Sequence, residues 1–438
     1  MAAFFPAGPE FRLSEQLDAD ARDARKTPGT EPLSYRHLLR VPGLPRVMIA
    51  ALLGRTALQM QSVALVLFAL ERFHSPAVAG VTVFANAFPG VLVSPLAGAV
   101  LDRRGRIGLI ALDYLVAAST MALLVVLGLT GVLSAGLLVG VAVLGSLTGP
   151  LSGAGTRSLF PVLVPRRLWD RANAVDSTGY VVAAVIGAPL AGTIAGLVSV
   201  SAALVATAIV FAFAALSLIG APPLQLPATP SPSQSVVRDA WAGLVYVVRN
   251  PTLRGLAVCL SILNVGSGLF IIGLPVLVLD HLHLNAAVVG ALWALSALSG
   301  GTSAILVGHR GSHGRERRLI MAGMLASAAA LAALAVAPSL AAAVLAMLVY
   351  GAAGGAIDVG MFSLRQRQTD PAWYGRAFAV SMSLNWAGSP LGSAAAGPLL
   401  APGLGVAAGF PLLSAVVARV MVPGPAPSSP ATRAASGS

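Results

Sequence analysis

Charge is what this sequence has least of. Only 10% of its 438 residues are charged, whereas 56% are hydrophobic, and the mean hydropathy is +0.83. A soluble domain carries charge on about a quarter of its residues, because its surface has to face water. Most of the surface of this chain must therefore face something else, and we expect that surrounding to be a lipid bilayer.

Cysteine is almost as scarce. Cys259 is the single cysteine of the chain and lies within an apolar run, which excludes an internal disulfide framework or a thiolate metal site. We expect it to be a small buried hydrophobe. The phosphate-binding pattern GxxxxGK[ST] is missing, so the sequence shows no ATP-driven mechanism. His281 and His283 stand beside Asp280 in a predicted loop and are interpreted as solvated side chains. No catalytic constellation, cofactor site or metal site is predicted.

What the chain has in abundance is long apolar runs. A helix needs about twenty such residues to cross the hydrocarbon core of a bilayer. Twelve runs meet this length, in two groups of six separated by a polar stretch: 46–70, 77–101, 107–129, 134–157, 175–197 and 200–220, then 255–279, 287–308, 318–337, 339–362, 377–400 and 403–422. The predicted fold class is an all-α membrane protein with twelve transmembrane helices.

Arginine marks one side of the membrane. The loops after the even-numbered helices hold seventeen arginines, whereas the opposite loops hold Arg72 alone. Positively charged loops stay in the cytoplasm, so both termini are predicted to be cytoplasmic in a multi-pass protein of the inner or plasma membrane. The net charge of +12 is thus spread over separate loops, and no nucleic-acid partner is predicted.

The alternation of apolar runs and polar stretches divides the chain into five parts. The first eight residues are too short for the apolar region of a cleavable signal peptide and have no basic stretch before them, and residues 222–233 form a Pro- and Ser-rich linker. In 236–249, apolar residues including Trp241 share one helical face, which predicts an amphipathic helix at the lipid interface. The predicted parts are a cytoplasmic tail (1–43), a six-helix bundle (44–221), a cytoplasmic linker with the amphipathic helix (222–251), a second six-helix bundle (252–422) and a cytoplasmic tail (423–438).

A short repeat indicates that the two bundles are related. RANAV at 171–175 is followed by Pro189 and Gly192, and RAFAV at 376–380 is followed by Pro390 and Gly397. The offset of the two copies matches a duplication of six helices. Halves repeated in parallel are a known plan of transporters.

The most specific motif is GAVLDRRGR at 98–106, between the second and third predicted helices. It resembles the loop signature of the major facilitator superfamily, with which Gly98, Asp102, Arg103, Gly105 and Arg106 match position by position. The corresponding stretch of the second half, GHRGSHGR at 308–315, lacks the acidic residue. The resemblance covers about residues 44–422 and implies two pseudo-symmetric six-helix bundles, with helices 1, 4, 7 and 10 around a central cavity.

Further resemblances point to export. The segments 160–175 and 247–255 look like the macrolide- and siderophore-exporter branch of that superfamily. Helix 5 partly matches the Gly/Pro pattern of proton-coupled antiporters through Gly187, Pro189, Gly192 and Gly196, but Ala188 and Thr193 depart from it. A proline kink with small-residue packing explains the same residues equally well.

Charges within the predicted helices are few, and a charge inside a bilayer is a functional hypothesis. Arg55 lies nine residues beyond Arg46 in helix 1, about 13 Å along the helix axis. Gln59 and Ser62 share its helical face. Asp358 in helix 10 and Asp113 in helix 3 lie at shallower depth.

These residues, together with neutral polar ones, form the predicted site. We expect the coupling and substrate cavity to contain Arg55, Gln59, Asn264, Asp358 and Asn385. Asp113, Arg157 and Pro189 are secondary candidates, since Asp113 lies in a peripheral helix and could brace it against Arg55 or Arg157. Trp293 and Trp386 are either aromatic walls of the cavity or packing residues.

The sequence therefore predicts a secondary active transporter without enzymatic activity. The first hypothesis is a proton-coupled exporter of a small, partly apolar organic compound that works as a monomer, with Asp358 as the proton carrier. An importer or a lipid-type flippase on the same scaffold is the alternative within transport. A membrane sensor or assembly partner that does not transport is the alternative outside it.

Overall fold

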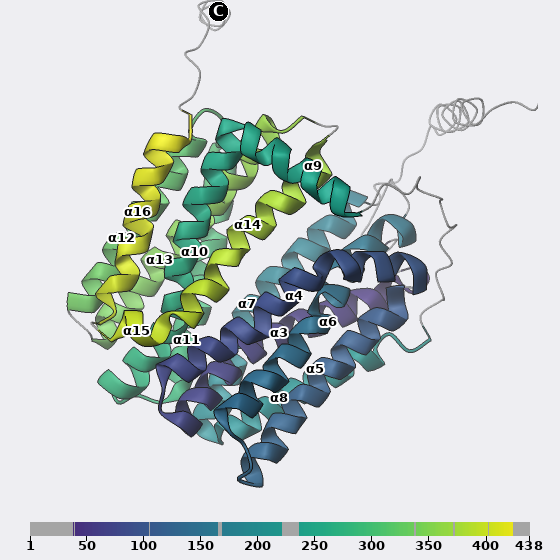
Figure 1. The fold of residues 1–438 in the computed structure, drawn as a ribbon, viewed down its shortest axis with the longest axis vertical. Helices are drawn as coiled ribbons and strands as arrows, with labels where there is room; N and C mark the ends of the chain where they lie inside the picture. The colour runs from purple at the N-terminus through teal and green to yellow at the C-terminus, as the bar shows by residue number, and fades with distance from the viewer. Residues whose placement is uncertain are drawn as a thin grey trace, which may run out of the picture.

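The computed structural model describes residues 38–423, apart from 39, 105, 165–168, 221–235, 337–338, 371–372 and 402. Its long elements are helices (Figure 1). The first half contains α3 (Leu44–Phe73), α4 (Pro76–Arg104), α5 (Arg106–Leu129), α6 (Ala135–Leu163), α7 (Trp169–Leu197) and α8 (Val200–Leu216). After α9 (Val236–Arg249), the second half contains α10 (Pro251–Val276) with the π-helical turn η2 (Leu277–His281), α11 (Ala286–Arg310), α12 (Glu316–Val336), α13 (Leu340–Gln368), α14 (Tyr374–Ala394), α15 (Ala396–Leu400) and α16 (Gly405–Met421).

These helices confirm the predicted fold class. Nine helices of the described chain are long and apolar enough to cross a membrane. Two shorter apolar helices, α8 and α16, lie where the sixth and the twelfth spans were predicted. The remaining helix, α14, is less apolar because it carries polar residues toward the protein interior: Ser381 is fully buried and Asn385 is 3% exposed. Twelve helices of spanning type therefore form two groups of six.

Two predicted boundaries were wrong. The span predicted over 377–400 is broken into α14 and α15 four residues after Pro390, which lies inside α14. The span predicted to begin at 175 begins at Trp169, so Asp176 lies within α7 rather than beside its end. Elsewhere polar residues fix the helix starts. Asn250 accepts hydrogen bonds from the backbone of Thr252 and Leu253, and so caps α10.

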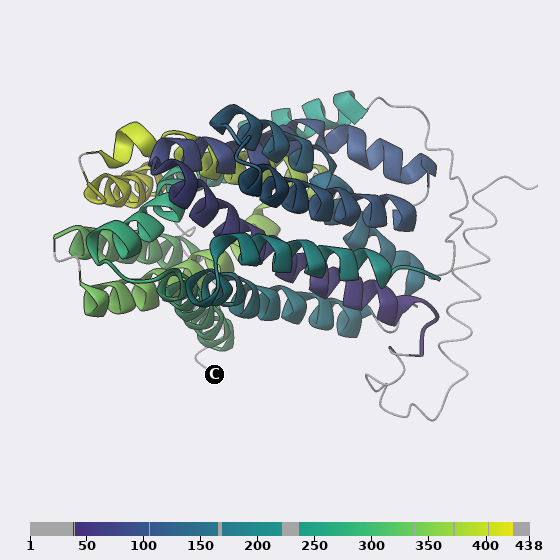
Figure 2. The same cartoon turned by 90° about the horizontal axis from the view of Figure 1, so that it is seen from below.

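The two groups of six form two bundles. In Figure 1 the helices α3–α8 lie together and α10–α16 lie together, with α9 across one end of the second bundle. Figure 2 shows from a second direction that most of the long helices run side by side. α9 is attached to the second bundle: the rings of Tyr246 and Trp373 stack 5.1 Å apart, and the Asn250 side chain donates to the carbonyl of Gln368 at 3.0 Å. Trp241 on α9 is 65% exposed.

Small residues join the bundles at one end of the molecule. A Cβ atom at Gly192 of α7 would lie 2.8 Å from the carbonyl oxygen of Ala286 in α11, and one at Gly397 of α15 would lie 2.5 Å from Cβ of Ala77 in α4. Only glycine permits this approach of two backbones. Both glycines belong to the repeat found in the sequence. We call these two contacts the small-residue seam.

The buried apolar clusters agree with that arrangement. The largest cluster draws residues from both halves, for example Leu204 and Leu269. Two smaller clusters are each confined to one half, around Phe211 in the first and around Leu256 and Cys259 in the second. The halves therefore share a core near the seam and have separate cores elsewhere. Cys259 is fully buried, as predicted.

Candidate central cavity

The halves enclose a cavity whose lobes meet at Trp386 of α14. The central lobe has a volume of about 360 Å³ and is lined by helices of both halves, with Gln59 from α3, Asn264 from α10, and Trp293 from α11. Tyr350 of α13 contributes its ring and donates a hydrogen bond from its hydroxyl to Oγ of Ser267 at 2.9 Å. The lobe thus combines aromatic rings with neutral hydrogen-bonding groups.

A second lobe opens beside it in the second half and holds Asp358. This Asp358 lobe has a volume of about 220 Å³ and shares Asn264, Tyr350 and Trp386 with the central lobe. Asp358 is exposed to the cavity, and no arginine, lysine or histidine of the described chain forms an ion pair with it. The carboxylate is therefore free to meet a proton or a ligand.

Asn385 completes the Asp358 lobe. Its side chain is 3% exposed, and its Nδ2 atom donates to Sδ of Met361 at 3.3 Å. Within the described part of the chain, its Oδ1 atom has no hydrogen-bond donor. A buried acceptor without a donor is costly, so a donor group that reached this oxygen would relieve that cost.

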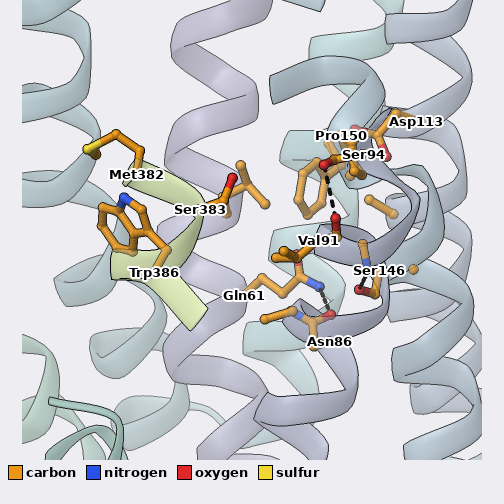
Figure 3. A pocket seen from close by; sticks show the side chains of 17 residues that line it. Gln61, Asn86, Val91, Ser94, Asp113, Ser146, Pro150, Met382, Ser383 and Trp386 are labelled. Carbon is orange, nitrogen blue, oxygen red and sulfur yellow. Dashed lines mark hydrogen bonds between the residues drawn. The ribbon is translucent and has the colours of Figure 1, made fainter. Parts of the chain in front are cut away.

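The third lobe lies in the first half, between α4, α5 and α6, and has a volume of about 420 Å³. Figure 3 shows Trp386 and Met382 of α14 on one side and the hydrogen-bonded pair Gln61 and Asn86, 2.9 Å apart, on the other. Asp113 lines this lobe but is only 4% exposed. The side chains of Thr148 and Ser152 hydrogen bond with it, so its carboxylate is held by hydroxyl groups.

Arg55 lies outside these three lobes. Its Nη2 atom forms an ion pair with Oδ1 of Asp176 in α7 at 2.6 Å, its Nη1 atom donates to the carbonyl of the same residue at 3.0 Å, and its guanidinium lies 3.7 Å from the ring centre of Tyr180. It borders a separate pocket of about 310 Å³ between α3 and α7. The suggestion that Asp113 braces against Arg55 was therefore wrong.

A second arginine, Arg365, is buried in the described chain and also lies outside the cavity lining. Arg365 lies seven residues beyond Asp358 in α13, about 10 Å along the helix axis. It is 1% exposed, and its Nη1 atom donates to Sδ of Met382 at 2.8 Å. Met382, rather than the guanidinium, lines the Asp358 lobe. Nor do the described residues include a group of three or more histidine, cysteine or acidic side chains placed to hold a metal ion.

Comparison with known proteins now identifies the family. The sequence model of the Major Facilitator Superfamily matches residues 47–393 and again 256–437. The chain belongs to the Major Facilitator Superfamily. It is also 39% identical over 396 residues to a protein of Sinorhizobium fredii described as an uncharacterized MFS-type transporter, y4rN, covering 89% of this chain and 97% of that one. This superfamily member is thus a multi-pass transporter of small molecules, not an enzyme.

Solved structures share the fold of this superfamily member. The nucleoside transporter NupG superposes with a TM-score of 0.68 at 15% identity, over 86% of this chain and 98% of NupG. A bacterial homolog of the human lysosomal transporter Spinster, in an inward-facing and occupied conformation, superposes with a TM-score of 0.70 at 14% identity, over 90% and 97% of the two chains.

The loop signature falls at the junction of α4 and α5. Residues 98–104 lie in α4, which ends at Arg104 and so extends past the predicted end at 101, and α5 begins at Arg106. Gly105 lies outside the described residues, and so do the side chains of Asp102, Arg103, Arg106 and Arg157. Gly98 lies within α4. The roles predicted for these residues stay predictions.

Of the predicted site, the structure brings Gln59, Asn264, Asp358 and Asn385 around Trp386 and separates Arg55 from them. Pro189 lies inside α7 and its Cα atom packs 2.8 Å from the position of a Cβ atom at Gly290, so it borders the other half rather than the cavity. Sequence reasoning missed Tyr350, Ser267 and Asp176. Ser267 lies three residues beyond Asn264 on the same helical face, which was a usable signal.

Proposed function

We propose that this protein is a proton-coupled exporter of a small, partly apolar organic compound, working by alternating access. The observation that carries the proposal is Asp358, an exposed carboxylate without a cationic partner in the described chain, which lines a lobe of the second half that adjoins the central lobe between the two bundles. A carboxylate in this position is neutral when protonated and charged when it is not. Its affinity for substrate then depends on its proton, which is what coupling requires.

The packing of the halves supports alternating access. The small-residue seam closes one end of the molecule, whereas the apolar clusters near the other end belong to one half each. We propose that the seam lies on the outer side of the membrane and that both termini are cytoplasmic, because the arginine-rich loops lie at the opposite end.

The direction of transport is proposed from the sequence. The likeness of 160–175 and 247–255 to the macrolide- and siderophore-exporter branch favours export, and the cavity is large enough for a compound with one or two rings. NupG is a nucleoside transporter, but an identity of 15% is too low to transfer its substrate to this protein.

We propose the organisation of the chain as predicted. The parts are two cytoplasmic tails, 1–43 and 423–438, the bundles 44–221 and 252–422, and the linker 222–251. The exposed Trp241 of α9 supports an interfacial position for that helix, because tryptophan favours the boundary between lipid and water. We propose that the protein acts as a monomer in the inner or plasma membrane.

The loop signature is proposed to control the conformational change. Asp102 would stabilise one conformation by meeting a helix terminus, where a negative charge is favourable. We expect Asp102→Asn to reduce transport strongly at unchanged expression in the membrane, and the matched variant Arg104→Ala to have a mild effect. Transport by Asp102→Asn at the wild-type rate would leave the motif with a topological role only.

Uptake into everted membrane vesicles tests the proposal as a whole. Candidate drugs and siderophores are added with the vesicle interior acidified, and again after the pH gradient has been collapsed. We expect accumulation that depends on the gradient. Accumulation only in right-side-out vesicles would indicate an importer, and binding without accumulation would indicate a sensor.

A further inference from the structure

The charge of the cavity is opposite to that of the protein. The chain carries a net charge of +12, yet among the described residues lining the three lobes there is no arginine, lysine or histidine, while two carboxylates, Asp113 and Asp358, are present. Only Asp358 is exposed; Asp113 is held by hydroxyl groups. Of the described arginines discussed above, Arg55 pairs with Asp176, and Arg365 donates from Nη1 to the sulfur of Met382.

The Asp358 lobe offers hydrogen-bond acceptors. Asp358 and Asn385 both line it; Asn385 is only 3% exposed, and its buried Oδ1 atom accepts no hydrogen bond from the described residues. An ionised carboxylate and an amide oxygen can only accept. The complementary ligand group is therefore one that carries positive charge and several N–H donors.

The adjoining central lobe offers aromatic surface. Trp386 is 61% exposed. Trp386 and Tyr350 line both lobes, and Trp293 lines the central lobe. The ring of Phe270 holds the last two in place, with ring centres 5.2 Å from Tyr350 and 5.9 Å from Trp293. Such rings stack on planar ligands and attract cations over their faces.

From these observations we propose that the substrates are protonated aromatic amines. The ring system occupies the central lobe against Trp386, and the ammonium group donates to Asp358 and Asn385. This inference rests on the proposed transport function and narrows its substrate class. It disfavours anionic compounds, including acidic siderophores. An anion in the lobe would be repelled by the carboxylate of Asp358 and would meet no cationic side chain among the described lining residues.

Equilibrium binding to the purified full-length protein in detergent tests the charge preference. Radiolabelled tryptamine is the probe, competed by tryptophol and by indole-3-acetate, which carry the same ring with a neutral and an anionic tail. We expect tryptamine to bind about tenfold more tightly than tryptophol, and indole-3-acetate to bind most weakly. N,N,N-trimethyltryptammonium, a cation without N–H groups on its charged nitrogen, should bind more weakly than tryptamine. Equal affinities within the series, or no tryptamine binding, would overturn the inference.

Variants then assign the preference to the lobe. Asp358→Asn should bind tryptamine no more tightly than tryptophol, whereas the matched control Asp280→Asn, which removes a charge from an exposed position of η2, should keep the preference. A preference retained by folded Asp358→Asn would overturn the inference. The wild-type series decides the question even if that variant does not fold. These measurements use no pH gradient, so a failure of proton-coupled export would leave them interpretable and would appear separately in the vesicle assay.

Discussion

The two halves of the molecule differ in whether their intramembrane charged side chains have partners. In the first half Arg55 is paired with Asp176, and Asp113 is 4% exposed among hydroxyl groups. In the second half Asp358 faces the cavity with no ion pair to any described residue. Removing one partner of a buried ion pair is costly, whereas an intramembrane carboxylate without a partner is a functional hypothesis. The comparison therefore favours a structural role for the charges of the first half and the proposed coupling role for Asp358 in the second.

Removing the carboxylate of the second half should have the largest effect. Asp358→Asn cannot change its charge, so we expect the rate of transport driven by a pH gradient to fall about tenfold or more. The measurement is uptake into everted vesicles at matched expression, with Asp280→Asn as the control. If Asp358→Asn retains coupling, the comparison is broken, Asp358 is structural, and Asp113 becomes the next residue to test.

Separating the halves at their seam should have the next largest effect. The side chain of Gly192→Val would overlap the carbonyl of Ala286, and overpacking of this kind costs about 1–3 kcal/mol. We expect the closed end to open about tenfold more often. A cysteine at Ser267 in the central lobe should then be labelled faster by an impermeant maleimide on intact cells.

The control for that substitution is Gly140→Val, because no heavy atom lies within 4 Å of a Cβ atom at Gly140. Unchanged labelling in Gly192→Val would mean that the seam does not hold the halves together. Labelling that rises in both variants would point to a general loosening of the first bundle.

Breaking the ion pair of the first half should affect stability more than transport. Arg55→Ala leaves Asp176 without its partner at 14% side-chain exposure, and we expect a loss of about 1–3 kcal/mol and a lower unfolding temperature in detergent. Arg55→Gln combined with Asp176→Asn should recover much of the lost stability, since the double variant leaves no unpaired charge at this site. The exposed Arg315→Ala is the control. A substrate-dependent defect in Arg55→Ala without loss of stability would move Arg55 into the transport machinery.

The smallest expected effect is that of single cysteines used to map the membrane sides. On a Cys259→Ser background, Thr130→Cys and His313→Cys are both at exposed positions, on loops at opposite ends of the bundles. Transport should be unchanged, with Thr130→Cys labelled by an impermeant reagent on intact cells and His313→Cys labelled only after the membrane is opened. Labelling of both on intact cells would contradict the proposed orientation.

The sequence was sufficient for the architecture because membrane thickness fixes the length of each span. The same reasoning could not find the partner of Arg55. Asp176 is 121 residues away in the chain, and it stands at the start of the apolar run predicted over 175–197, where nothing marked it as a partner. Which side chains meet depends on how α3 and α7 are rotated against each other, and hydrophobic periodicity leaves that rotation open.

The cavity was predictable in part, since Arg55 borders a separate pocket. The predicted residues that do line it are Gln59, Asn264, Asp358 and Asn385. Asp358 stands out in an apolar helix, whereas Tyr350 and Ser267 are ordinary residues of membrane helices until the fold brings them together. Trp386 was assigned to either a wall or packing, and the three lobes that meet at it decide for a wall.

That meeting point has an evolutionary consequence. Because Trp386 borders all three lobes, a single codon change there alters the shape of every compartment at once, while changes at Gln61 or Asn385 alter one. If the substrates change, selection acts fastest at the position where one substitution alters the shape of the largest part of the cavity. Lineages that acquire new substrates on this scaffold should therefore vary first at position 386, and those that keep an old one should hold it fixed.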